Sequence, residues 1–217
     1  MKIGIIGGTG PQGKGIALRL AKAGIQVIIG SRSEERAKIK AQELNDILSS
    51  LLISGLSNID LVNNCDILFL TTPYESVRDT VLSLVENMKT RTKILVDVTV
   101  PLTFEKGKGM VFVDMEGGSM AKYVQNLVDP IPVVGALKTI GAHALLDLEK
   151  PLERDTFVVG LKDPRNQIIE LLSKIEGLRA IDAGPLREAV TIERLVPFLI
   201  NINRRYKVKD SGLKVIM

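Results

Sequence analysis

The sequence predicts an α/β fold, a Rossmann-type doubly wound parallel sheet with a small C-terminal α/β domain. Two observations support this prediction. Short apolar runs rich in Val and Ile alternate along the chain with longer helical patterns, which is typical of βαβ units and a parallel sheet. In addition, the segment GIIGGTGPQGKG, residues 4–15, places a glycine-rich turn directly between the first apolar run and the first helical pattern.

The sequence pattern in the first half of the chain predicts strands and helices in regular alternation. Gly24 ends the first helical pattern. Ser33 is placed to cap the second helix, and Glu34 and Glu35 follow in its first turn, where negative charge is favourable. We expect strands at residues 2–6, 26–29, 51–55, 66–70 and 93–98, and helices at residues 13–23, 34–48 and 75–88.

The second half repeats this pattern on a smaller scale after Pro151, which predicts two domains, residues 1–145 and 146–217. The stretch 103–118 is rich in glycine and shows no clear pattern. We expect strands at residues 131–137, 156–160 and 178–182, a helix at residues 164–175 and a long final helix at about residues 186–205.

The glycine-rich turn matches the spacing G-x-G-x-x-G at residues 8–13, with Pro11 and Gln12 as its last variable positions. In a strand–turn–helix setting, Gly8 permits the tight turn, Gly10 lets a pyrophosphate approach the backbone, and Gly13 lets the helix pack closely on the strand. The helix N-terminus then offers free N–H groups to phosphates. The turn therefore predicts a dinucleotide site, although a plain strand-to-helix turn has the same glycines.

The residues after the second strand indicate which dinucleotide binds. An NAD site normally has an Asp or Glu there, which bonds the ribose 2′-hydroxyl. Here the chain has Gly30, Ser31 and Arg32 instead, and Arg36 follows one helical turn later. Arginine can bind a 2′-phosphate with two hydrogen bonds. The segment predicts NADP(H), and the alternative is an ordinary solvated helix start.

Composition narrows the class of protein. The net charge is +4, yet aromatic residues make up only 4% and Trp is absent, so small anionic ligands explain the basic excess better than a nucleic acid. No apolar run approaches the ~20 residues of a membrane span. The single cysteine, Cys65, is typical of a reducing compartment, and we expect a cytoplasmic protein.

Few side chains suggest metal or acid–base chemistry. A lone cysteine and a lone histidine, His143, disfavour a zinc cluster, and we expect no bound metal. His143 could donate a proton, but beside the apolar Ala-Leu-Leu run it is more often structural. Asp182, just before Ala-Gly-Pro, could serve equally as a site carboxylate or as a turn acceptor.

Several longer segments carry a family resemblance. The runs GGTGPQGKGIALRLAKAG, IIGSRSEERA, CDILFLTTPYE, GALKTIGAHAL, GLRAIDAGPL, LVPFLININ and LKVIM cover nearly the whole chain. Together they resemble the NADPH:coenzyme F420 oxidoreductases of archaea and some bacteria. The resemblance implies a homodimer with an NADP-binding Rossmann domain and a small C-terminal domain that contributes to the cleft and the dimer. It also implies hydride transfer between NADP(H) and the deazaflavin F420.

The resemblance further implies which residues touch the coenzymes. The 2′-phosphate would be held by Thr9 together with Ser31, Arg32 and Arg36. The segment beside the cofactor would be Thr71, Thr72 and Pro73, at the end of the strand 66–70. Val100 and Ala142 would line the nicotinamide end and the deazaflavin cleft.

One segment departs from the family pattern. Where the family reads His-Thr-Ile-Pro-Ala, this chain has Lys138, Thr139, Ile140, Gly141 and Ala142. We expect the Lys138 ammonium to pair with the anionic deazaflavin ring or its phosphate-bearing tail, although lysine cannot act as a neutral imidazole. The alternative is that Lys138 points to solvent.

This departure leaves two other functions open. The chain could be an NADPH-dependent reductase of another acceptor, such as a flavin, an imine or a metal chelate. It could also be a non-catalytic protein that senses NADP(H).

Overall fold

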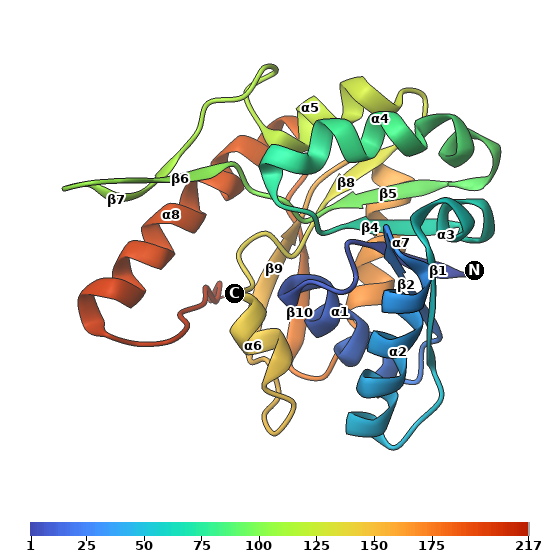
Figure 1. Ribbon diagram of the computed structural model, residues 1–217. Coiled ribbons are helices and arrows are strands. Elements are labelled where there is room, and N and C mark those ends of the chain that lie inside the picture. Colours follow the sequence, from blue (N-terminus) through green and yellow to red (C-terminus); the bar gives the residue numbers. More distant parts are fainter. Residues whose placement is uncertain (217) are drawn as a thin grey trace.

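The computed structural model describes residues 1–216. Its centre is a parallel sheet of six strands in the order β3-β2-β1-β4-β5-β8 (Figure 1). The strand order runs outward in both directions from β1, so the connections that leave the carboxyl ends of the paired strands β1 and β4 run to opposite sides of the sheet. Ligands of such sheets bind in the crevice between these connections. The strands are β1 (Ile3–Ile6), β2 (Val27–Ser31), β3 (Ile53–Ser57), β4 (Ile67–Leu70), β5 (Ile94–Asp97) and β8 (Val133–Gly135).

Helices cover both faces of the sheet, and Figure 1 shows α4 and α5 above it and α1 and α2 below. Successive strand side chains point to opposite faces, so Phe69 packs on the layer of α1 and α2 while Leu68 packs on the layer of α4 and α5. The helices are α1 (Pro11–Lys22), α2 (Glu34–Leu48), α3 (Asn58–Asn64), α4 (Tyr74–Arg91), α5 (Met120–Val128), α6 (Ala142–Leu146), α7 (Lys162–Leu172) and α8 (Ala189–Tyr206), with a short 3₁₀ helix at Leu186–Glu188.

The C-terminal segment continues the same core. Strands β9 (Arg154–Val158) and β10 (Leu178–Asp182) form a parallel pair, with α7 between them in the chain. Gly135 and Val159 exchange two backbone hydrogen bonds of 2.9 and 3.0 Å, which join this pair to the end of β8. Ile168 and Leu172 of α7 belong to the core cluster that contains Ile3 and Ile5 of β1. The division at residue 145 stays a prediction.

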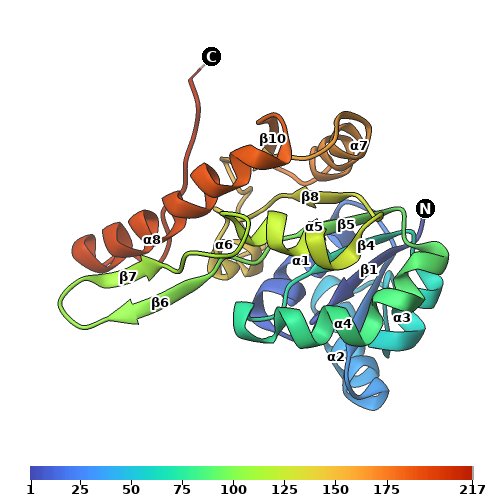
Figure 2. The same ribbon diagram turned by 90° about the horizontal axis from the view of Figure 1, so that it is seen from above.

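A two-stranded antiparallel hairpin, β6 (Leu102–Glu105) and β7 (Gly109–Phe112), extends from the body beside α8 (Figures 1 and 2). Asn201 of α8 holds it, because its side chain accepts a hydrogen bond from the Met110 N–H (3.0 Å) and donates one to the Met110 carbonyl (2.8 Å). The sequence showed no pattern here, since both strands are short and their side chains do not alternate between buried and exposed.

Every strand predicted from the sequence is present, with ends that differ by a few residues. The sequence did not predict α3, α5 or α6. Helices α3 and α6 contain only 7 and 5 residues, too few to show a helical repeat. The expected cap at Ser33 is confirmed, because its side chain accepts a hydrogen bond from the Arg36 N–H at 3.3 Å. No helix within residues 1–216 combines the length and apolarity needed to cross a bilayer.

Asp155 links β9, β10 and the C-terminal tail. Its buried carboxylate accepts hydrogen bonds from the Arg179 guanidinium at 2.8 and 2.7 Å and from the Val215 N–H at 2.5 Å. The hydrogen bonds from Arg179 lower the pKa of Asp155 below its ordinary value. The Asp155 carboxyl therefore binds its proton less tightly in the folded chain than in the unfolded chain. The carboxylate stabilises the fold above pH ~4, and this contribution is lost as the pH falls further.

We expect Asp155→Asn to lower the melting temperature at pH 7, because hydrogen bonds to a charged group contribute roughly 1.5–3 kcal/mol, or roughly 3–12 °C in a chain of this size. Thermal unfolding followed by circular dichroism between pH 7 and pH 3 measures the effect. The difference between wild type and variant should shrink below pH ~4. A difference that stays constant over this range would contradict the assignment.

Candidate active site

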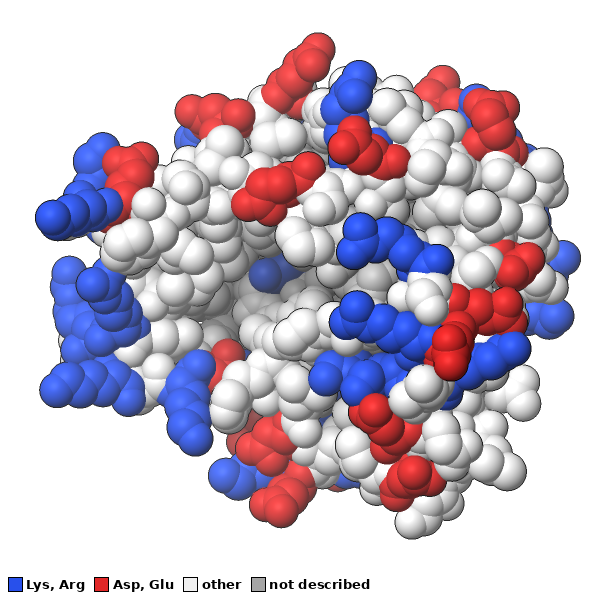
Figure 3. Space-filling model, in the orientation of Figure 1, with Lys and Arg blue, Asp and Glu red and all other residues white. Residues whose placement is uncertain are grey.

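A cavity of about 630 Å³ lies at the carboxyl ends of the central strands. Figure 3 shows the same face as Figure 1, hollowed near its middle, with Lys and Arg side chains gathered to the right of the hollow. Among the described residues that line the cavity, none is Asp or Glu. The lining residues used in the argument below are Thr9, Gly10, Gln12, Ser31, Arg32, Arg36, Asn58, Thr71, Thr72, Pro73, Val98, Thr99, Val100, Lys138, Ile140, Gly141 and Val196.

The glycine loop forms one end of this cavity, and its glycines serve different purposes. A Cβ at Gly8 would lie 2.6 Å from the Ile29 Cβ, and one at Gly13 would lie 2.6 Å from the Gly8 Cα, so close packing requires both glycines. A Cβ at Gly10 would meet only the Gly7 carbonyl oxygen, at 3.4 Å. The fold therefore tolerates a side chain at Gly10, and its bare backbone faces the cavity.

One expectation about this loop needs correction. The sequence predicted that Gly8 permits the tight turn, but the residue in the left-handed conformation is Gly7, with φ +77°. The Gly8 N–H donates hydrogen bonds to the Ile5 and Gly30 carbonyls at 3.2 and 3.1 Å, which hold the turn onto β1 and β2.

Helix α1 begins at this loop with its N-terminus facing the cavity. Gly10 is the N-cap residue and supplies no side-chain cap, Pro11 follows it, and the first turn carries no acidic residue. The partial positive charge of this helix end is thus left for an anion. Gln12 also lines the cavity, and its side chain donates a hydrogen bond to the carbonyl of Ile140, another lining residue, at 3.0 Å.

The residues predicted to select NADP(H) meet at one edge of the cavity. Ser31 is the last residue of β2, and Arg32 and Arg36 expose their side chains around the start of α2. Asn58, the first residue of α3, lines the same edge, and its buried Oδ1 has no hydrogen-bond partner among residues 1–216. The sequence analysis missed Asn58, because α3 is too short to be recognised.

Thr71, Thr72 and Pro73 line the middle of the cavity, beyond β4. The Thr71 hydroxyl donates to the Ile6 carbonyl at 2.8 Å and so closes the end of β4 onto β1. The Thr72 Oγ1 is buried without a hydrogen-bond partner in the described structure. An unpartnered hydroxyl that lines a cavity is available to a polar ligand.

The other end of the cavity is largely apolar. Val98 and Val100 follow β5, Ile140 and Gly141 come from the loop after β8, and Val196 comes from α8. Three residues that the sequence analysis considered for this site, Thr139, Ala142 and His143, are not among the described residues that line the cavity.

His143 lies instead on a second, smaller hollow near Arg19 and Lys150 and is not among the lining residues of the candidate site. Burial raises the pKa of the Cys65 thiol to about 11, so this cysteine is a neutral core residue. Asp182 accepts a hydrogen bond from the Gly184 N–H at 2.8 Å, as a turn acceptor does. The described residues contain no group of His, Cys, Asp and Glu placed to hold a metal ion.

The expectation that Lys138 pairs with a deazaflavin is wrong. Its ammonium is buried and contacts the Asp97 carboxylate (2.6 Å), the Glu193 carboxylate (2.9 Å) and the Thr99 carbonyl oxygen (2.7 Å). Burial alone would lower the pKa of Lys138, but the two carboxylates outweigh this effect and raise it. All three donors of the ammonium are used inside the protein.

Comparison with known proteins agrees with this architecture. A family model described as NADP oxidoreductase, coenzyme F420-dependent, matches residues 2–101. The F420-dependent NADP reductase of Methanocaldococcus jannaschii is 38% identical, over 99% of this chain and 98% of the relative. The F420-dependent NADP reductase of Methanothermobacter marburgensis is 37% identical over the same shares.

A crystal structure of a candidate F420-dependent NADP reductase from Arthrobacter sp. FB24 superimposes with a TM-score of 0.82 at 23% identity, with all of both chains covered. At that identity the superposition shows the fold alone. The match to the archaeal relatives extends over nearly the whole length, and it shows that the chain belongs to the F420-dependent NADP reductase family.

Proposed function

We propose that this chain transfers a hydride between NADP(H) and coenzyme F420, with both molecules in the cavity described above. The observation that carries this proposal is the polarity of the cavity. One end has a helix N-terminus and two exposed arginines with no carboxylate, and the other end is apolar. A phosphate-rich dinucleotide fits the first end, and a flat aromatic ring fits the second.

The dinucleotide end suits NADP(H) in particular. The pyrophosphate would lie against the bare backbone of Gly10 at the start of α1, beside Thr9. Arg32 and Arg36 would bind the 2′-phosphate, with Ser31 adding a hydroxyl. The unpartnered oxygens of Asn58 and Thr72 offer hydrogen-bond acceptors to the rest of the ligand.

The apolar end would hold the nicotinamide and the deazaflavin against each other. Both coenzymes supply the redox chemistry themselves, so the protein must bind them, orient them and exclude water. Val98, Val100 and Val196 present apolar side chains for this purpose. Transfer needs roughly 3–3.5 Å between the donor and acceptor carbons, and rigid walls maintain that approach.

An acceptor screen tests the proposal directly. NADPH oxidation is followed by absorbance with oxidised F420, FMN and FAD as separate acceptors. We expect turnover with F420 at least a hundredfold more efficient, as kcat/KM, than with either flavin. Equal turnover with FMN would indicate a general NADPH reductase. Tight NADPH binding without any turnover would indicate a sensing protein.

We also propose that the chain forms a homodimer through the face made by α8 and the β6–β7 hairpin. Phe104 of β6 and Phe198 of α8 are 59% and 58% exposed, and an exposed apolar patch is typical of a surface that binds another chain. Sedimentation should give the mass of a dimer for the wild type and of a monomer for Phe104→Asp/Phe198→Asp. A monomeric wild type would contradict the proposal. The cytoplasmic location stays a prediction from the lone cysteine.

A further inference from the structure

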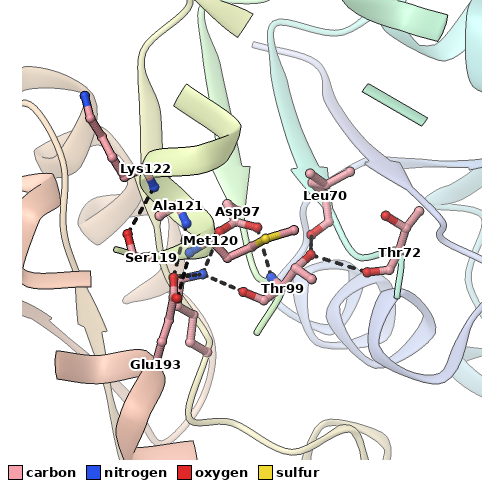
Figure 4. A network of polar contacts seen from close by, with 10 residues as sticks. Leu70, Thr72, Asp97, Thr99, Ser119, Met120, Ala121, Lys122 and Glu193 are labelled. Carbon is pink, nitrogen blue, oxygen red and sulfur yellow. Dashed lines mark hydrogen bonds and ion pairs between the residues drawn. The ribbon is translucent and has the colours of Figure 1, made fainter. Parts of the chain in front are cut away.

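Three charged side chains from distant parts of the sequence meet beside the apolar end of the cavity. Asp97 ends β5, Lys138 follows β8, and Glu193 lies in α8. The side chains of Lys138, Asp97 and Glu193 are 1%, 0% and 0% exposed. Figure 4 shows Asp97, Thr99 and Glu193 turned toward one another in this network. A buried ionic cluster is a costly arrangement, because the desolvation of the charges offsets much of their attraction.

The cluster fixes the peptide that forms one wall of the cavity. The Thr99 carbonyl accepts from the Lys138 ammonium at 2.7 Å, and the Thr99 N–H donates to Asp97 at 3.0 Å. The Thr99 hydroxyl donates to the Thr72 carbonyl at 3.3 Å. Every polar group of Thr99 is therefore held, and its neighbours Val98 and Val100 line the cavity.

The same cluster also holds a second part of the cavity lining, which comes from α8. The Glu193 carboxylate accepts from the backbone N–H groups of Met120 (2.8 Å) and Ala121 (3.1 Å), at the first turn of α5. Val196, just under one turn further along α8, lines the cavity. Lys138 thus contacts two walls of the cavity. The first wall, formed by Val98 and Val100, is reached through the Thr99 carbonyl. The second wall, formed by Val196, is reached through the Glu193 carboxylate.

We propose that Lys138 is a positioning residue that sets the geometry between these two walls and thereby tunes the acceptor end of the cavity, leaving the NADP(H) end unaffected. It is not a catalytic residue, because its ammonium is enclosed by protein oxygens. That the acceptor is F420 rests on the proposed function. The positioning role of Lys138 does not rest on it, because amide exchange in the protein alone can measure that role.

Two variants separate the walls. Lys138→Met removes both links and leaves two buried carboxylates without their cation, which is destabilising. Glu193→Gln keeps the bonds of Lys138 to Asp97 and Thr99 and weakens only the link to α8. Asp155→Asn is the control, because it also removes the charge of a buried carboxylate that is paired with a cation, but Asp155 lies outside the described lining of the cavity.

Equilibrium binding and hydrogen exchange give the readouts. We expect Lys138→Met to raise the F420 dissociation constant, measured by coenzyme fluorescence, at least tenfold, while the NADPH constant changes less than threefold. Amide exchange should quicken at residues 98–100 and 190–196 in Lys138→Met, but only at residues 190–196 in Glu193→Gln. Lys138→Arg, which keeps the charge, should recover part of the F420 affinity.

Clear outcomes would overturn the proposal. It fails if Lys138→Met lowers the melting temperature as Asp155→Asn does but leaves F420 affinity and local exchange unchanged. Equal weakening of F420 and NADPH would also overturn it. If Lys138→Met does not fold, unchanged exchange in α8 of Glu193→Gln decides against it. A wild type that neither binds nor reduces F420 refutes the proposed function instead, and the exchange data still decide the positioning role.

Discussion

Replacing both Arg32 and Arg36 by alanine should weaken NADPH binding by roughly 10²–10⁴-fold, because each hydrogen bond to the charged 2′-phosphate contributes ~1.5–3 kcal/mol. Both side chains are exposed, so solvent screening favours the lower part of that range. NADH lacks the 2′-phosphate, and its affinity should barely change. Titration of coenzyme fluorescence with each dinucleotide measures both constants.

The same helix offers a control for this result. Lys38 is an exposed basic residue of α2 that pairs with Glu34 at 2.7 Å and does not line the cavity. Lys38→Ala removes one positive charge close to Arg36, against two in the double variant, so it reports how much of the effect a nearby charge produces without contact to the ligand. If the double arginine variant loses affinity for NADPH and NADH equally, the cluster does not recognise a 2′-phosphate.

Gly10→Val should abolish binding of both dinucleotides and leave the protein folded. A Cβ at Gly10 meets only the Gly7 carbonyl oxygen, at 3.4 Å, so the protein has room for the side chain. The same side chain would occupy the space that a pyrophosphate needs against the backbone. We expect no saturable fluorescence change with NADPH and a melting temperature within a few degrees of wild type.

Gly13→Ala provides the opposite case three residues away. Its Cβ would lie 2.6 Å from the Gly8 Cα and 2.8 Å from the Gly7 carbonyl oxygen, and these are backbone atoms that cannot move aside cheaply. We expect Gly13→Ala to lower the melting temperature of the protein, so that any loss of NADPH binding follows from the loss of stability. Normal NADPH affinity in Gly10→Val would remove the basis for placing the dinucleotide at this loop.

Much of the fold and of the dinucleotide end could be predicted from the sequence, because both depend on local patterns. The glycine loop, Ser31 and the two arginines lie within one βαβ unit, and such a unit folds in one way. The local sequence of such a unit is therefore enough to predict how its residues lie relative to one another. The apolar repeats of the central strands are equally local, and they predicted the parallel sheet.

The acceptor end could not be predicted in the same way, because residues far apart in the sequence build it. The Lys138 side chain is held inside the protein partly by its ion pair with Glu193 on α8. No residue close to Lys138 in the sequence indicates this partner. Val196 lines the cavity for the same reason. A lysine at the end of a strand is usually exposed, and a buried one needs carboxylates that only the tertiary structure reveals.

The hydrogen bond from Gln12 to the Ile140 carbonyl joins the phosphate end of the cavity to the loop of its acceptor end. A ligand that shifts either partner changes the energy of this bond, and both ligands then act on one shared contact. Thermodynamic linkage requires such an effect to be reciprocal: the factor by which NADP(H) changes the affinity for the acceptor equals the factor by which the acceptor changes the affinity for NADP(H). Through this bond the chain has a physical route to cooperativity between its two substrates in the ternary complex.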